Sequence, residues 1–143
     1  MSLTINQIVK SIKDYANQHA QIEYVFFGAI YDRLSKQDVK YPALFFDIES
    51  SRILAKQTEL TFSLYFLDRQ LQETEGLEIM SDMLLVAQDI VAELRNNQNL
   101  YDVSEIIPLD FLIETDPDYL AGVKVTISLT IPNINNRCVI PTN

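Results

Sequence analysis

Apolar residues recur at spacings of three and four in two segments, and this period is typical of helices with one buried face. The first segment is residues 5–16, where Thr4 followed by Gln7 is the pattern of a capping box at a helix start. The second runs from about residue 74 to residue 96. Its expected buried stripe consists of Leu77, Met80, Met83, Leu84, Ala87, Ile90, Val91 and Leu94.

Other segments alternate apolar and polar residues, which is the period of a strand with one buried face. Strands are expected at residues 22–27, 43–50 and 59–66, and the polar residues 50–56 predict the turn of an antiparallel hairpin. Gly28 is expected to end the first of these strands or to permit a tight bend. The side chains expected to point into the core are Leu44, Phe46, Ile48, Leu60, Phe62, Leu64 and Phe66.

The last third of the chain alternates again and predicts two more strands. In residues 107–113 the apolar positions are Ile107, Leu109, Phe111 and Ile113. The partner strand is expected at residues 123–131 and ends at Pro132, with a turn at residues 115–118 before it. A loop with one helical turn near residues 30–34 is expected earlier in the chain.

The element order is therefore helix, strand, strand, strand, helix, strand, strand. This order predicts an α+β fold in which one antiparallel sheet carries both helices on one face and is solvated on the other. A chain of 143 residues fits one domain, expected at residues 1–132, with an irregular C-terminal tail at residues 133–143.

The charge of the chain argues against a role that depends on gripping DNA. The formal net charge is −9, and nucleic-acid affinity comes mostly from Lys and Arg that neutralise phosphates. No run of about 20 apolar residues is present, so no membrane span is expected, and the N-terminus lacks the pattern of a secretory signal. The single cysteine, Cys138, favours a reducing compartment such as the cytosol.

No pattern in the sequence indicates catalysis or a cofactor. The three glycines do not form a phosphate-binding loop, and one histidine with one cysteine is too few for a zinc site of the usual ligand type. His19 is expected to interact with the carbonyl groups at the end of the first helix. We therefore expect no enzyme activity, no cofactor and no bound metal.

Two pairs of carboxylates deserve separate consideration, because paired acids can perform acid–base chemistry or hold a divalent cation. Asp47 and Glu49 share one strand face, and Asp110 and Glu114 share another. A solvated strand face predicts the same alternation, so we interpret all four as surface residues.

Two surfaces are candidates for contact with other proteins. Residues 24–27 and 45–46 carry more aromatic side chains than a thin two-layer core needs on one face, and aromatic residues are enriched at interfaces. The other surface is the final hairpin with its polar tail. The candidate interface residues are Tyr24, Phe26, Phe27, Tyr31, Tyr41, Phe45, Asp116, Asp118, Tyr119, Asn135, Arg137, Val139 and Ile140.

Three segments of the chain resemble a known protein family. They are residues 27–32 (FGAIYD), residues 40–44 (KYPAL), and the final strand that ends in Ile131-Pro132 before the tail at residues 135–138 (NNRC). Together with the element order, they resemble the tail-terminator and neck ring proteins of tailed bacteriophages, and the overall pattern is close to that of the neck proteins of crAss-like gut phages. The resemblance covers most of the chain.

The resemblance implies a structural virion subunit, made in the host cytoplasm, that forms a closed ring at the phage neck or tail end. It implies sixfold or twelvefold rings, neighbouring neck, portal or tail proteins as partners, and DNA only as passing cargo. Acidic residues lining such a ring would let DNA slide without binding. Tail terminator, head–tail connector and tail-tube component are all open as the specific role.

Two alternatives come from other classes of protein. A cytosolic α+β module that binds a small molecule between helices and sheet would have a preformed apolar pocket with a few polar groups. A metal-dependent enzyme would rely on the carboxylates of Asp47, Glu49, Asp110 and Glu114, and replacing each of them would abolish its activity.

Overall fold

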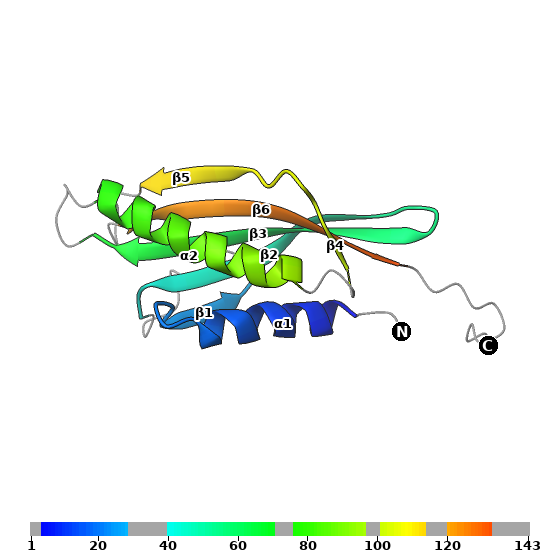
Figure 1. The fold of residues 1–143 in the computed structure, drawn as a ribbon, viewed down its shortest axis with the longest axis horizontal. Helices are drawn as coiled ribbons and strands as arrows, with labels where there is room; N and C mark the ends of the chain where they lie inside the picture. Colours follow the sequence, from blue (N-terminus) through cyan, green and yellow to red (C-terminus); the bar gives the residue numbers. More distant parts are fainter. Residues whose placement is uncertain (1–3, 29–39, 71–75, 97–100, 114–119, 133–143) are drawn as a thin grey trace.

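The computed structural model describes residues 4–28, 40–70, 76–96, 101–113 and 120–132. These residues form two helices and one sheet of six strands, which confirms the predicted α+β class (Figure 1). The helices are α1 (Ile5–Gln18) and α2 (Gly76–Asn96). The strands are β1 (Tyr24–Phe27), β2 (Ala43–Ile53), β3 (Gln57–Arg69), β4 (Asp102–Val103), β5 (Leu109–Ile113) and β6 (Leu120–Pro132).

The sheet has the strand order β1-β2-β3-β6-β4, and β5 pairs with β6 beside β4. All pairs are antiparallel except β1 with β2, which run parallel, so the expectation of a purely antiparallel sheet was wrong. The connection between β1 and β2, residues 28–42, is long enough to return the chain to the same end of the sheet. The short strand β4 was not predicted, because two residues are too few to show a period.

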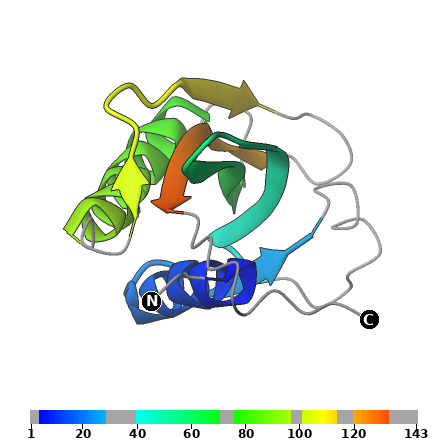
Figure 2. The ribbon, with the colours of Figure 1, turned by 90° about the vertical axis from the view of Figure 1, so that its right-hand side faces the viewer.

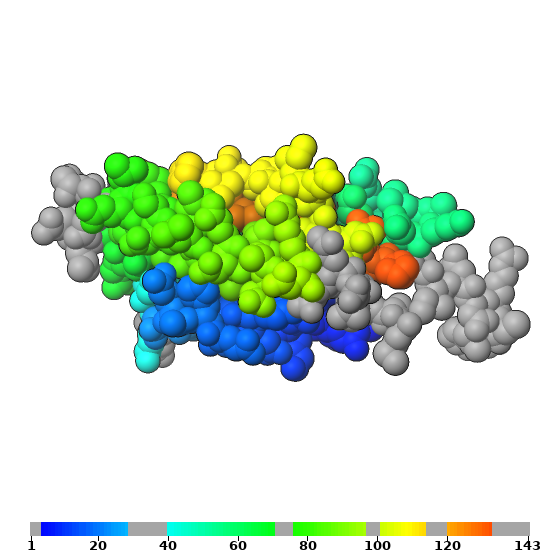
Figure 3. All heavy atoms as spheres, in the orientation of Figure 1, coloured from blue at the N-terminus to red at the C-terminus, as the bar shows by residue number. Residues whose placement is uncertain are grey.

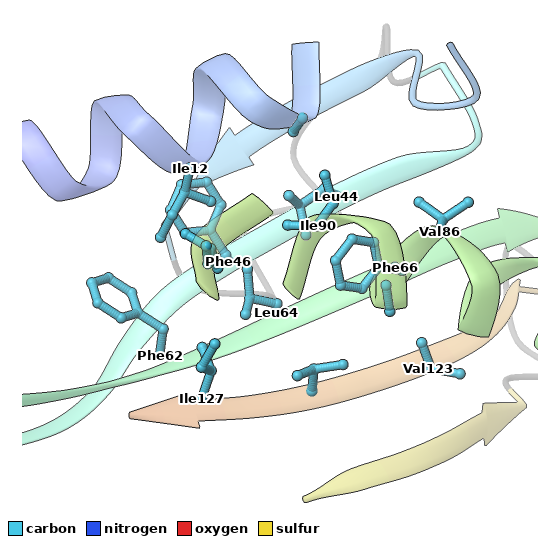
Figure 4. Close-up of a cluster of buried hydrophobic side chains, with 14 of the residues drawn as sticks. Ile12, Leu44, Phe46, Phe62, Leu64, Phe66, Val86, Ile90, Val123 and Ile127 are labelled. Atoms are coloured by element: carbon cyan, nitrogen blue, oxygen red, sulfur yellow. The ribbon is translucent and has the colours of Figure 1, made fainter. Parts of the chain in front are cut away.

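Both helices pack on the same face of the sheet, as predicted (Figure 2). Helix α1 lies beside β1, and α2 lies over β3 and β6. The predicted capping box is present at the start of α1: Thr4 Oγ1 accepts from Gln7 N at 3.2 Å, and Thr4 N donates to Gln7 Oε1 at 2.9 Å. Figure 4 shows the core between the layers. Its largest side chains include Phe46, Phe62 and Phe66, which point inward as the alternation predicted.

Helix α2 covers the predicted span, but its buried face differs in part from the predicted stripe. Met83, Ala87, Ile90 and Leu94 are buried, whereas Leu77 is 72% exposed. Apolar residues also occupy the helix face next to the buried one. The sequence pattern did not separate these two faces, so the predicted stripe included residues of both. The residues that complete the true buried face are Gly76, Ile79 and Val86.

The β2–β3 hairpin is longer than expected. Residues 50–53 were expected to belong to the turn, but β2 continues to Ile53 and β3 begins at Gln57. The register shifts by one residue between Ile48 and Ser50, where a β-bulge interrupts the alternation on which the prediction relied. The hairpin therefore extends beyond both helices (Figure 1).

Candidate interaction surfaces

The predicted aromatic residues lie on both faces of the sheet, because successive side chains of a strand point to opposite sides. Phe27 packs on the helix side against Phe46, with ring centroids 5.1 Å apart. Tyr24, Phe26 and Phe45 lie on the face without helices. The sequence-based assumption that these aromatics share one face was therefore wrong.

On that helix-free face, Phe45 is the centre of a second apolar cluster. Its side chain is 0% exposed, and the rings of Tyr24 and Phe26 lie 6.0 and 6.2 Å from its own. Tyr41 and Tyr65 also pack against this cluster, and each ring carries a cation at its face: Arg69 lies 5.3 Å from the Tyr41 centroid and Lys124 lies 5.6 Å from that of Tyr65. These aromatic residues thus pack against one another within the chain.

The other candidate interface residues, which are Tyr31, Asp116, Asp118, Tyr119, Asn135, Arg137, Val139 and Ile140, lie outside the described residues. So do the expected turns at residues 30–34 and 115–118, Glu114 and the C-terminal tail.

The carboxylates of β2 are engaged in local contacts. Asp47 Oδ1 accepts from the backbone N–H of Ile48 at 2.8 Å, and Glu49 Oε2 accepts from Ser63 Oγ at 3.1 Å. Asp110 lies opposite Lys124 in the β5–β6 ladder. Among the described residues, no three His, Cys, Asp or Glu side chains gather in a way that could hold a metal ion.

His19 caps α1, but its ring contacts helix α2 and not the carbonyl groups expected from the sequence. Its Nε2 lies 2.8 Å from Asp89 Oδ2, and its Nδ1 accepts from the backbone N–H of Gln21 at 3.1 Å. With Nδ1 as acceptor, the neutral ring carries its proton on Nε2 and donates it to Asp89. The pair therefore joins the two helices across the surface of the domain.

Residues 49–57 of the β2–β3 hairpin, called here the hairpin arm, are exposed at every position. At the tip, Ile53 is 81% exposed and Leu54 is 40% exposed. Arg52 and Glu59 face each other across the two strands, with Arg52 Nε and Nη2 at 3.1 and 3.3 Å from the two carboxylate oxygens. The arm is ordered by its own ladder and adds no side chain to the core.

A groove runs between α2 and β5 on the helix side of the sheet. It measures about 580 Å³ and opens to solvent, and Figure 3 shows β6 at its floor between α2 and the β4–β5 segment. Its apolar lining consists of Leu84, Ala87, Val91, Ile107, Leu109 and Val125, and the remaining lining residues include Gln88, Ala92, Arg95 and Glu105. We call this the α2–β5 groove.

Exposed apolar side chains continue this groove toward the start of α2. Leu77 lies seven residues before Leu84 and therefore on the same side of the helix. Phe111 and Ile113 point to the same sheet face as Leu109, but they are 57% and 56% exposed on the edge strand β5. Their alternation with polar residues was predicted from the sequence, and their high exposure follows from their position at the sheet edge.

Two strand edges carry no partner over part of their length. Strand β1 pairs with β2 only from Ala43 to Phe46, and within the described ranges no strand pairs with the outer edge of β2 from Asp47 to Ile53. Strand β5 pairs only with β6 in the same part of the chain. Open edges of this kind are templates for pairing with another chain.

The comparison with known proteins adds no assignment: no family model matches the chain, and no curated protein matches it significantly. Neither of the two described helices is long and apolar enough to cross a membrane.

Proposed function

We propose that this chain is a structural subunit that assembles head to tail into a closed ring, and that the ring belongs to the neck or tail end of a tailed bacteriophage. The observation that carries the assembly proposal is the hairpin arm. The arm is ordered, and its apolar tip lies outside the core of its own domain. Burial of this tip by another molecule would remove its apolar surface from water and so stabilise the contact.

The unlike nature of the exposed surfaces supports a ring. The hairpin arm projects at one end of the sheet (Figure 1), whereas the α2–β5 groove lies on the helix side, along residues 84–96 of α2. When two different patches of one protein bind each other, the contact is heterologous, and repeated contacts close into a ring or extend into a filament. A closed ring of this kind contains a fixed number of copies around a central channel.

The phage assignment rests on the resemblance of residues 27–32, 40–44 and 131–138 to tail-terminator and neck ring proteins. The charge of the chain supports it as well. Glu78, Asp82, Asp89 and Glu93 are all exposed and fall on one flank of α2, and the net charge is −9. A ring with such surfaces toward its channel would let DNA pass without binding it.

A second candidate function is favoured by the α2–β5 groove alone. A volume of about 580 Å³ lies within the range of about 300–1,000 Å³ that is typical of small-molecule sites. Such sites enclose most of the ligand, however, whereas this groove opens to solvent. The exposed arm also has no role in a monomeric binding module.

Electron microscopy of the purified full-length protein tests the ring proposal. Particle images should average to rings with an open centre and rotational symmetry, sixfold or twelvefold in the phage role. Single particles of one subunit that retain a small molecule, identified by mass spectrometry after denaturation, would support the binding module instead and would contradict the ring.

A further inference from the structure

We propose that the apolar tip of the hairpin arm, Ile53 and Leu54, of one copy inserts into the α2–β5 groove of the next copy. This inference rests on the proposed head-to-tail assembly and names the two surfaces that form its contact. The occupant of the groove is therefore a second copy of this chain.

The apolar tip of the arm is left exposed by its own domain. Ile53 and Leu54 are 81% and 40% exposed, and all the other residues of the arm are exposed too, so the domain itself does not shield them. Apolar surface at such a tip stays hydrated unless a partner covers it, and this hydration is unfavourable.

The arm is also ordered before any contact is made. The ladder pairs of β2 and β3 continue to Ile53 opposite Thr58, and the turn is closed by the backbone bond from Leu54 N to Gln57 O at 2.7 Å. The two-point contact of Arg52 with Glu59 holds the strands together just below the tip. A preorganised arm loses little conformational freedom on binding, so more of the contact energy appears as affinity.

The groove offers the matching chemistry. Apolar side chains of α2, β5 and β6 line most of it, with Gln88, Arg95 and Asn96 of α2 as polar neighbours, and it is open along the surface, so a projecting side chain can enter from solvent. Glu105 lines the groove and Lys56 is exposed beside the tip, so their opposite charges can meet when the tip is seated. Arg95 also lines the groove, and its Nη2 donates to the backbone carbonyl of Glu105 at 3.1 Å. The match between tip and groove is therefore mainly apolar, and the carboxylate of Glu105 is the group that Lys56 would approach.

The tip cannot occupy the groove of its own chain. The arm extends beyond the ends of both helices (Figure 1), whereas the groove lies along α2 itself. The contact must therefore form between copies, and because tip and groove are different surfaces, each copy can give its tip to one neighbour and receive the tip of another.

The tip alone is a small part of an interface. Stable interfaces bury about 800 Å² on each partner, and a two-residue tip supplies only an anchor within that area. We therefore expect a weak pairwise contact that becomes strong when the ring closes, since closure makes the last contact intramolecular.

Site-directed cross-linking tests the inference. In a Cys138→Ser background, one variant carries Ile53→Cys and another carries Ala92→Cys, an exposed position of the groove. With a short bis-maleimide, an equal mixture of the two should give cross-linked dimers, and a chain carrying both changes should give a ladder of larger products. Each single variant alone should stay monomeric on a denaturing gel, because tip does not meet tip and groove does not meet groove.

Substitutions at the tip test the same contact without a cross-linker and without a change in the groove. Ile53→Asp should weaken association at least 100-fold, whereas Ile53→Val should change it only a few-fold, and both should melt like the wild type because Ile53 lies outside the core. Two outcomes would overturn the tip-in-groove contact and leave the ring proposal standing. One is full assembly of the Ile53→Asp variant. The other is a mixture of the two single-cysteine variants that forms rings but gives no cross-linked dimer. Wild-type protein that stays monomeric at every concentration would overturn both proposals.

Discussion

Gly122 of β6 lies so close to Phe66 of β3 that a Cβ atom on Gly122 would sit 1.8 Å from the Phe66 carbonyl oxygen. Real Cβ atoms do not approach a backbone atom to that distance, so any side chain at this position must push the two central strands apart. β3 and β6 are neighbouring inner strands that pair along their whole length, and this contact lies between them near the start of β6.

We therefore expect Gly122→Ala to lower the free energy of unfolding by about 3 kcal/mol or more, since backbone cannot move aside as a side chain can. Denaturation with urea measures the change. The matched control is Gly76→Ala at the start of α2, where the nearest atom to an added Cβ is the side-chain oxygen of Gln70 at 3.3 Å. That variant should stay within about 1 kcal/mol of the wild type. Equal stability of the two variants would mean that the strands adjust freely at Gly122.

The core facing of β3 and β6 gives a second prediction. Phe62 and Ile127 are 0% exposed and lie opposite each other in the ladder. Truncating Phe62 to Ala should cost about 3–5 kcal/mol through the loss of buried contacts and the cavity that remains. Phe111→Ala, on the exposed edge strand, removes the same side chain and should cost far less. Thermal melts compare the two, and a small shift for Phe62→Ala would contradict the description of the core.

Tyr101 predicts a dependence of stability on alkaline pH. Its side chain is buried, its hydroxyl has no partner among the described residues, and burial, with a smaller contribution from Tyr15, raises the pKa of Tyr101 above its ordinary value near 10. The unfolded chain therefore ionises this group at a lower pH than the folded chain. Stability from this residue is complete below about pH 10 and is lost as the pH rises above that value.

Replacing this tyrosine isolates the effect. Tyr101→Phe should unfold with less sensitivity to pH between about 10 and 11 than the wild type, and at neutral pH it should be about as stable, because no hydrogen bond among the described residues is removed. Urea titrations at several pH values provide the measurement. Tyr24→Phe keeps Tyr101 and should retain the wild-type loss. An identical alkaline loss in Tyr101→Phe would show that Tyr101 is not its source.

The acidic surface predicts that the protein does not hold duplex DNA. At physiological salt we expect no retardation of a DNA fragment in a gel at micromolar protein, because the chain carries 20 acidic and 11 basic residues. Retardation that weakens steeply as salt is added would reveal a basic binding surface and contradict the passive-channel role.

The sequence predicted the fold where a period was long and unbroken, as in β3, β6 and the buried face of α1. It failed where tertiary contacts outweigh the local pattern. Nothing in residues 24–27 indicates that β1 runs parallel to β2, because that choice depends on where the following connection returns. The bulge near Glu49 also hid the true length of the hairpin.

The candidate interaction surfaces were predicted less well than the fold. Leu84 and Val91 read as core residues, since a groove-lining apolar residue and a core residue follow the same helical period. Phe45 read as an interface residue but fills a cluster on the helix-free face. A signal for the hairpin tip was present in Ile53 and Leu54, which are two apolar residues inside an otherwise polar segment.

Native mass spectrometry of the full-length protein over a wide concentration range tests the central claim of head-to-tail assembly most directly. The proposal predicts one dominant closed species, of six or twelve copies in the phage role, that forms without a ligand. A twofold dimer that grows no further, or a monomer that carries a bound small molecule, would contradict it.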